Sequence, residues 1–433
     1  MKKQYVNNMI GFIQNSPCSF LVIENTENKL KENGFVCLNN IDKWELKEGG
    51  KYYITRNGST LISFIVGKDA DKTGFRMIGS HTDSPSFVIK PNCEIKANSN
   101  YLKLNTEGYG GMILSTWLDR PLSIAGRVIL KGENIFKPKT KTIDFRRPIA
   151  IIPNLAIHLD REINNGHKYS KQKEMLPLLS LVGEDFNEKG YIYELIAKEI
   201  NVSKDDILDY ELFLYEAEKG SLIGIDEEFI SCSRLDDLMM VYNSLQGFLT
   251  YANSNNYSGI KVLYLADNEE VGSHTGQGAD GALLRDILKR VCISLFGCEE
   301  SFYSMAEKSV FISADLAHGV HPNYADKHDI TNKPVLNKGV CLKYSSNQKY
   351  STTGVCAGIF DGLCKEAGIS YQKFVNHSDV VGGSTIGAML ASQFNTAVID
   401  FGVCILGMHS IRELGSVNDT YDCYKLFAKF YEL

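Results

Sequence analysis

The sequence lacks the features that mark a membrane or secreted protein. None of its 433 residues lie in a stretch approaching the roughly 20 apolar residues that a membrane-spanning helix needs. Residues 1–23 start with Met and two lysines, but Asn, Gln and Ser interrupt their apolar positions, so we expect an amphipathic helix rather than a signal peptide. The eleven cysteines are scattered without a CxxC pair, which argues against a disulfide framework or a cysteine zinc site. We expect a cytoplasmic protein with no membrane partner.

An excess of positive charge is also missing. The formal net charge is −6, which gives no general attraction to nucleic acid, so no nucleic-acid partner is expected. The one basic run, residues 131–141, is predicted to be a solvated loop. No internal repeat or low-complexity tract is visible. The composition, 44% hydrophobic and 23% charged, is typical of a globular protein, and the length favours two domains over one compact core.

Short apolar runs that end in polar clusters indicate the fold class. Four of them read as buried strands: FRMIGSHTDSP, KVLYLADNEEVGS, SVFISADLAHG and AVIDFGVCILGMHS. Helical patterns such as DDLMMVYNSLQGFLTYA and GALLRDILKRVCISLFG lie between them. Strands that alternate with helices predict an α/β domain with a largely parallel central sheet.

The middle of the chain has a different pattern. Residues 93–230 carry alternating, strand-like segments and several turn signals. We interpret this region as a β-rich domain inserted into the first, which would then be assembled from residues 1–92 and 231–433.

Polar side chains gather where the predicted strands end, which is where open α/β sheets place their sites. They are His81, Asp83, Asp236, Asp237, Glu269, Glu270, Asp315 and His409. Two imidazoles and several carboxylates suit a divalent ion such as zinc, manganese or cobalt. A hydrolase with a single zinc ion needs only three protein ligands, so this set is large enough for two ions that share a bridging carboxylate.

The adjacent pair Glu269-Glu270 favours hydrolytic chemistry. Neighbouring side chains diverge, so one glutamate can bind metal while the other serves as general base toward a water molecule. Two ions would lower the pKa of that water and hold the tetrahedral oxyanion. A single short motif of this kind, such as Glu269-Glu270 or the pair His81 and Asp83, also has a simpler interpretation, because an acidic residue after a strand often caps the next helix.

The ordered motifs IGSHTDSP, SRLDDL, EEVGS, SADLAHGVHPNY, GGSTIG and GMHSIRE resemble those of the M18 metalloaminopeptidases. The resemblance extends over nearly the whole chain, including PNLAIHLDRE in the middle region. It implies a phosphorylase/hydrolase-like catalytic domain, an inserted dimerisation domain, and a homo-oligomer that forms a twelve-subunit shell from dimers. It also implies a co-catalytic two-metal aminopeptidase that removes the amino-terminal residue from peptides.

The resemblance further implies roles for individual residues. His81 and Asp315 would hold one ion, Glu270 and His409 the other, and Asp236 would bridge them. Glu269 would be the general base, and Asp83 would accept the second N–H of His81 and fix its tautomer. Asp237 is expected to be structural.

Other matching residues would act on the substrate. His158, in LAIHLDRE, resembles a histidine that reaches a partner subunit's active site; it could instead be an ordinary interface histidine. The substrate-side residues would be Lys343, Tyr350, Gly383 and Ser384. The cation of Lys343 favours an acidic amino-terminal residue, whereas HSDVVG before GSTIG departs from the acid-specific members, so the preference stays open.

Two alternatives remain at this point. A deacylase or carboxypeptidase of the same fold would use the same ligands on a different amide bond. A non-catalytic, metal-containing assembly protein is the alternative from another class, and the presence of Glu269 beside a full ligand set argues against it.

Overall fold

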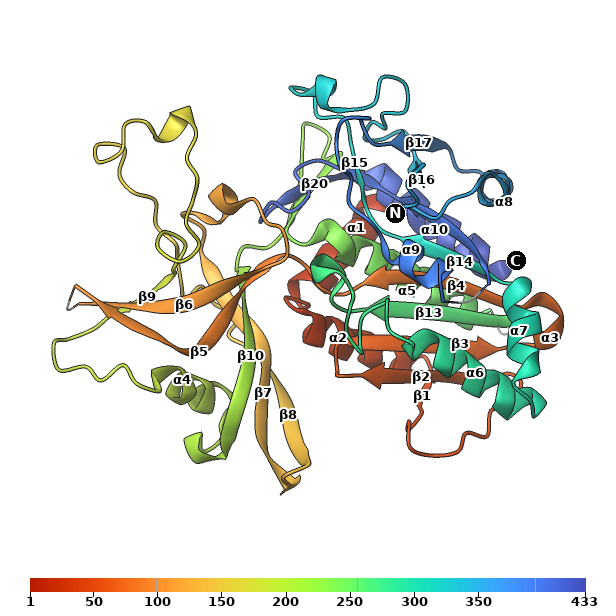
Figure 1. Ribbon diagram of the computed structural model, residues 1–433, viewed down its shortest axis with the longest axis horizontal. Helices are drawn as coiled ribbons and strands as arrows, with labels where there is room; N and C mark the ends of the chain where they lie inside the picture. The colour runs from red at the N-terminus through yellow and green to blue at the C-terminus, as the bar shows by residue number, and fades with distance from the viewer. Residues whose placement is uncertain (99, 255, 394) are drawn as a thin grey trace. The chain divides into compact units, whose positions relative to one another are not determined.

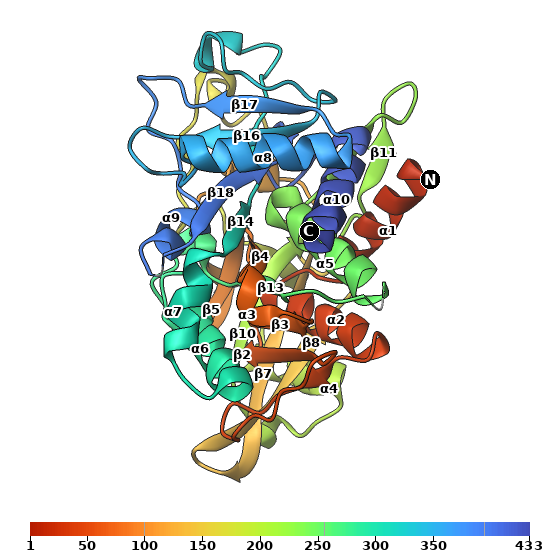
Figure 2. The ribbon, with the colours of Figure 1, turned by 90° about the vertical axis from the view of Figure 1, so that its right-hand side faces the viewer.

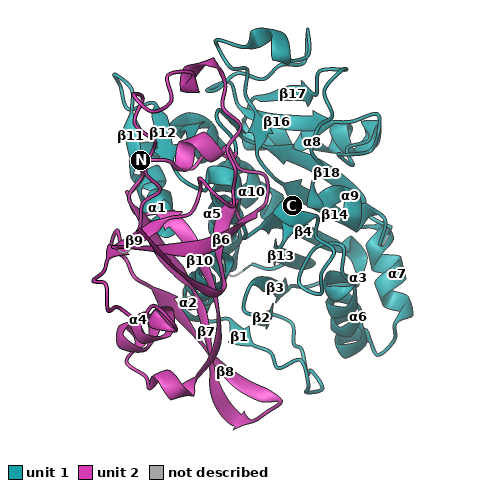
Figure 3. Cartoon of the chain, turned by 60° about the vertical axis from the view of Figure 1, so that its left-hand side comes forward, with its two compact units in different colours: residues 1–83, 220–408, 413–433 teal, residues 84–219, 409–412 magenta. Residues whose placement is uncertain are grey.

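The computed structural model describes residues 1–98, 100–254, 256–393 and 395–433. The chain divides into two compact units (Figure 3): the first comprises residues 1–83, 220–408 and 413–433, and the second comprises 84–219 and 409–412. The segment expected to form an inserted domain, residues 93–230, overlaps most of the second unit. Strand β5 (Ser86–Ala97) belongs over its whole length to the sheet of the second unit, while β12 (Phe229–Cys232) and its neighbour β11 (Ser221–Ile223) belong to the first.

The first unit is built on a nine-stranded mixed sheet (Figure 1). Its strands, in spatial order, are β1 (Val36–Cys37), β2 (Lys51–Arg56), β3 (Thr60–Val66), β13 (Ile260–Ala266), β4 (Phe75–His81), β14 (Val310–Ala314), β18 (Ala397–Gly402), β16 (Val340–Tyr344) and β17 (Tyr371–Val375). The neighbours β13, β4, β14 and β18 run parallel. These four strands are the four predicted apolar runs, so the predicted α/β class with a largely parallel central sheet is confirmed.

Helices cover both faces of this sheet (Figure 2). One face packs against α1 (Lys2–Gln14), α2 (Ser19–Glu32), α5 (Leu235–Ala252), α8 (Gly354–Ala367) and α10 (Val417–Glu432). The other packs against α3 (Ala70–Thr73), α6 (Leu283–Phe296), α7 (Glu300–Glu307) and α9 (Ile386–Ala391). Along β13, Leu263 and Leu265 join the first core while Val262 and Tyr264 join the second. Burial on both faces explains why this strand reads as a nearly continuous apolar run.

The amino-terminal segment forms the predicted amphipathic helix. Helix α1 buries Val6, Met9, Ile10 and Ile13, which recur every three or four residues and therefore share one helix face. The predicted helices after Arg234 and Gly281 are α5 and α6.

Strand β13 also carries a buried cation. Lys261 is 1% exposed, and its ammonium lies 5.5 Å from the ring centroid of Tyr251. Burial and, to a smaller extent, the nearby Arg76 guanidinium lower the pKa of this lysine to about 8.

The second unit is built on a six-stranded antiparallel sheet. Its order is β8 (Lys137–Asp144), β7 (Leu122–Asn134), β10 (Ile207–Glu216), β5, β6 (Tyr101–Tyr109) and β9 (Leu178–Leu181), and α4 (Tyr191–Ile200) packs with the same core. The basic run 131–141 forms the hairpin of β7 and β8 rather than a plain loop. Ile135 and Phe136 lie exposed in the turn of this hairpin.

Two small sheets complete the first unit. One has the order β11, β12, β20 (Glu413–Ser416), and the other pairs β15 (Ala317–His318) with β19 (Cys404–Ile405). Among the described residues, no helix is both long and apolar enough to cross a membrane. All eleven cysteines are free thiols.

Candidate active site

His81 stands at the carboxyl end of the central strand β4 and is 2% exposed. Its imidazole Nδ1 lies 3.0 Å from the main-chain oxygen of Asp83 and 3.4 Å from that residue's carboxylate Oδ1. Because Nδ1 faces two acceptors, it carries the proton, and Nε2 keeps its lone pair for a metal ion. Nε2 lies 3.4 Å from Asp236 Oδ1.

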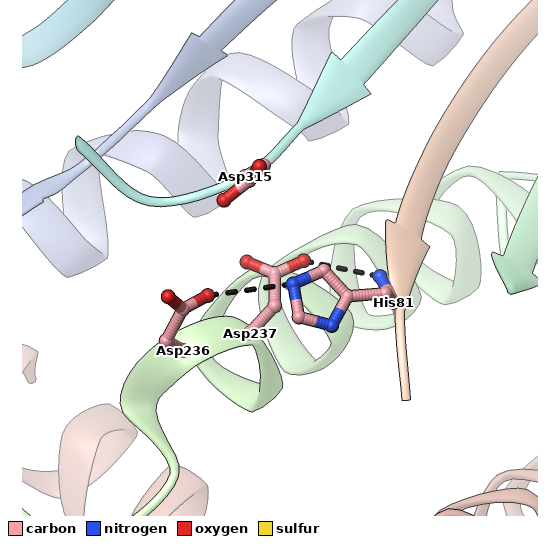
Figure 4. Close-up of side chains that lie close together, drawn as sticks. All are labelled: His81, Asp236, Asp237 and Asp315. Atoms are coloured by element: carbon pink, nitrogen blue, oxygen red, sulfur yellow. Dashed lines mark hydrogen bonds and ion pairs between the residues drawn. The ribbon is translucent and has the colours of Figure 1, made fainter. Parts of the chain in front are cut away.

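Asp236 and Asp237 open helix α5 and face His81 (Figure 4). Both residues have non-helical backbone angles, and the peptide bond between them is cis. Asp237 is fully buried, and its Oδ2 accepts the backbone N–H of His81 at 3.1 Å. Asp237 Oδ1 is buried without a hydrogen-bond partner among the described residues.

Asp315 follows strand β14 and completes this group. Ligand atoms of His81, Asp236, Asp237 and Asp315 all lie within 4.8 Å of one another. Lys343, on β16, places its Nζ 3.6 Å from Asp315 Oδ1 and 5.3 Å from the ring centroid of Tyr350. Burial opposes the charge of this ammonium, but Asp315 and the other acidic groups nearby together outweigh burial, so the pKa of Lys343 is raised.

Glu269 and Glu270 lie on a short 3-10 turn, Glu269–Val271, directly after β13. The carboxylate of Asp83 fixes this turn: Oδ1 accepts the N–H of Glu269 and Oδ2 accepts that of Glu270, both at 3.1 Å. Glu269, Glu270 and His81 offer ligand atoms within 4.8 Å of one another, and so do Glu270 and Asp236. The turn therefore brings both glutamates to the same cluster as His81.

The cluster holds more negative charge than its own cations balance. Burial raises the pKa of Asp237, and the charges of Asp315 and Asp236 raise it further. Burial likewise raises the pKa of Glu269, with Asp315 and Glu270 adding to it. Burying several carboxylates together is unfavourable unless a cation neutralises their charge. Imidazole and carboxylate donors suit zinc, so the residues present fit a metal centre.

His409 belongs to the second unit. The apolar run before His409 suggested that this residue ends a strand of the central sheet. Strand β18 ends earlier, at Gly402, and His409 instead starts a strip formed by residues 409–412. Its φ of +66° lies in the left-handed region, which costs a non-glycine residue about 1–2 kcal/mol. The main-chain oxygen of His409 accepts the N–H of Ile113 at 3.0 Å, and its Nδ1 donates to the oxygen of Gly111. Nε2 therefore carries the lone pair that a metal can use.

The substrate-side residues lie in different settings. Tyr350 is buried, whereas Gly383 and Ser384 are exposed on the loop before α9. His158 is exposed in a turn of the second unit.

Two buried carboxylates escaped the sequence analysis. Glu413 Oε2 accepts the backbone N–H of Asp236 at 3.0 Å, and its place in GMHSIRE was the only signal for it. Asp400 accepts the hydroxyl of Thr385 at 2.6 Å and the N–H of Ser351, so it joins the loop before α9 to the segment after Tyr350. Asp400 lies within an apolar run, and no sequence motif marked it as a candidate.

Comparison with known proteins places this geometry in a family. Residues 12–431 match the model of the aminopeptidase I zinc metalloprotease family, M18. The chain is 47% identical over 433 residues to a Clostridium novyi protein named "Probable M18 family aminopeptidase 2", covering 100% of this chain and 99% of that protein.

Solved structures agree. A chain in a cryo-EM structure of the Ape4 and Nbr1 complex gives a TM-score of 0.95 at 34% identity, covering 100% of this chain and 86% of that one. The mApe1 dodecamer of S. cerevisiae gives a TM-score of 0.87 at 27% identity, covering 98% and 96%. The chain therefore belongs to the M18 family of zinc metalloproteases and is an aminopeptidase.

Proposed function

We propose that this aminopeptidase works with two divalent ions per chain, zinc being the first candidate and manganese or cobalt the alternatives. His81 and Asp315 would hold one ion, Glu270 and His409 the other, and Asp236 would bridge them. The observation that carries this proposal is the buried excess of carboxylate charge around His81. The ligand atom of Asp236 within 4.8 Å of those of both His81 and Glu270 supports its bridging role.

Bound ions would lower the pKa of a water molecule and polarise the scissile carbonyl. The carboxylate of Glu269 takes a proton from that water and passes it to the leaving amine. Burial raises the pKa of Glu269, and a raised pKa favours uptake of a proton by this carboxylate during the reaction. Asp83 holds the Glu269 main chain in place.

The substrate would be a peptide with a free amino terminus, contacted by Lys343, Tyr350, Gly383 and Ser384. Lys343 is already opposed by Asp315 at 3.6 Å. An acidic substrate side chain would therefore compete with Asp315 for this ammonium, while a neutral one would not.

The second unit would be a dimerisation domain, and the assembly a dodecamer built from dimers. Leu155, Ile157 and Leu159 flank His158 and are exposed, which is the composition of a surface that a partner covers. A groove of about 570 Å³ in the same unit is lined by further apolar residues, among them Ile151 and Leu181. His158 would complete a neighbour's active site, and the free thiols support a cytoplasmic location.

A substrate panel tests the proposal. The chelated protein is assayed with zinc, manganese or cobalt added back, on the anilides of Leu, Asp and Glu and on N-acylated amino acids. Cleavage of the free-amine anilides alone supports the aminopeptidase, and the ratio of Leu to Asp and Glu rates gives the preference. Cleavage of only the N-acylated compounds would show a deacylase instead.

A further inference from the structure

The 409–412 strip holds His409 in a conformation that it would not adopt freely. The backbone of His409 is left-handed, at φ +66°. Glycine and asparagine adopt this conformation more easily than histidine does. Conformations of this kind persist only where the surroundings fix them. The contacts of the strip within the second unit therefore decide the direction of the imidazole.

Arg412 makes the strongest of these contacts. Its Nε lies 3.1 Å from both carboxylate oxygens of Glu216, and its Nη2 lies 2.9 Å from Oε2. Nη2 also donates to the main-chain oxygens of Glu218, at 3.1 Å, and Lys219, at 3.3 Å. This forked geometry uses several donors of one planar guanidinium, which a lysine cannot reproduce.

Glu216 is a firm anchor for the arginine. It ends strand β10 in the middle of the antiparallel sheet and is 1% exposed. Arg120 contributes a second cation, with its Nη1 3.4 Å from Glu216 Oε1. A buried carboxylate that pairs with two cations on a central strand therefore gives Arg412 a defined bidentate partner.

The residue between Arg412 and the strained turn is also fixed. The N–H of Ile411 donates to Thr116 Oγ1 at 3.0 Å, and its side chain is buried in the core of the second unit. Together with the bond from Ile113 to the oxygen of His409, these contacts hold both ends of the four-residue strip. The imidazole can then keep its bond to Gly111, which leaves Nε2 as the ligand atom.

We propose that Arg412 is a positioning residue for the second metal ion: its pairing with Glu216 holds the strained His409 so that Nε2 can bind that ion. The inference rests on the proposed role of His409 as a ligand. Loss of a residue that orients a ligand weakens metal binding by about 10- to 100-fold.

The experiment measures zinc affinity in four variants of the full-length chain. Competition with a chromogenic chelator gives the affinities of the tighter and the weaker ion, and elemental analysis gives the number of ions. Arg412→Met removes the charge and the fork, while Arg412→Lys keeps the charge and serves if the methionine variant does not fold. Arg127→Met is the matched control, because Arg127, on β7, pairs with Glu211 on β10, the strand that also carries Glu216. His409→Ala tests the ligand itself.

We expect His409→Ala to lose one ion and Arg412→Met to bind that ion 10- to 100-fold more weakly, with the other ion unaffected. Arg412→Lys should lie between it and the parent, and Arg127→Met should match the parent. Parental affinity in both Arg412 variants, while His409→Ala loses an ion, would overturn the positioning role and leave the proposed function standing. Two ions retained in His409→Ala would overturn the ligand assignment, and the inference with it. Equal weakening of both ions in the Arg412 and Arg127 variants would show general destabilisation and also refute the inference.

Discussion

Asp83→Asn tests whether one carboxylate holds the turn that carries the proposed base. Asp83 accepts the N–H groups of Glu269 and Glu270, one on each carboxylate oxygen, at 3.1 Å. Asparagine keeps one acceptor and turns an N–H₂ donor toward the other N–H. At least one hydrogen bond to a charged group is lost, and such bonds contribute about 1.5–3 kcal/mol each.

Relief of repulsion opposes this loss. The charge of Asp83 is one of the causes that raise the pKa of Glu269, so removing it lowers that pKa in the metal-free chain. Burial and the charges of Asp315 and Glu270 each raise the pKa of Glu269 more than Asp83 does. Removing Asp83 therefore relieves only a small part of the repulsion, and we expect the lost hydrogen bond to dominate. We expect the free energy of unfolding of the chelated protein to fall by about 1–3 kcal/mol. In the zinc-loaded enzyme kcat should fall at least about 10-fold, because the turn no longer holds Glu269 in place.

Urea unfolding of the chelated protein measures the first effect and steady-state kinetics the second. Asp69→Asn is the control, because the Asp69–Lys72 pair is exposed and its loss should leave the free energy of unfolding close to that of the parent. Asp83→Asn with the stability and kcat of the parent would refute the reasoning that this carboxylate fixes the turn.

Three further predictions follow from the same contacts. Asp236→Ala should lower the occupancy of both ions in elemental analysis, whereas Asp237→Ala should leave two ions bound; the opposite result would reverse the assignment. His158→Ala should lower kcat without changing metal content or oligomeric mass, and co-assembly with inactive Glu269→Gln should restore activity; no recovery in verified hybrid dimers would place His158 outside a neighbour's site. Lys261 has a folded pKa of about 8, below that of the unfolded chain, so the unfolded state binds more protons between that pH and about 10. Lys261→Met should therefore raise the urea midpoint at pH 7, and the gain should shrink toward pH 10; a constant gain would contradict the shift.

The sequence predicted the parts of the fold that depend on local pattern. The four apolar runs became β4, β13, β14 and β18 because a strand buried on both faces needs apolar residues at nearly every position. Helices α5 and α6 follow from the same kind of periodicity.

Contacts between distant residues could not be predicted in this way. The bond from Glu269 to the carboxylate of Asp83 spans 186 positions, and that from Asp236 to Glu413 spans 177. Strand β5 continues across residue 93, so local pattern alone does not mark where the two compact units divide. His409 belongs to the second unit, and the pairing of Arg412 with Glu216 in that unit joins residues 196 positions apart without a local signature.

Glu269→Gln tests the central claim most directly. Glutamine has the shape of glutamate but cannot accept the proton, while every proposed metal ligand remains. Elemental analysis of the zinc-loaded variant should find two ions per chain, and kcat on an amino-acid anilide should fall at least about 100-fold, the scale for loss of general-base catalysis. A variant that binds two ions and turns over like the parent would contradict the account.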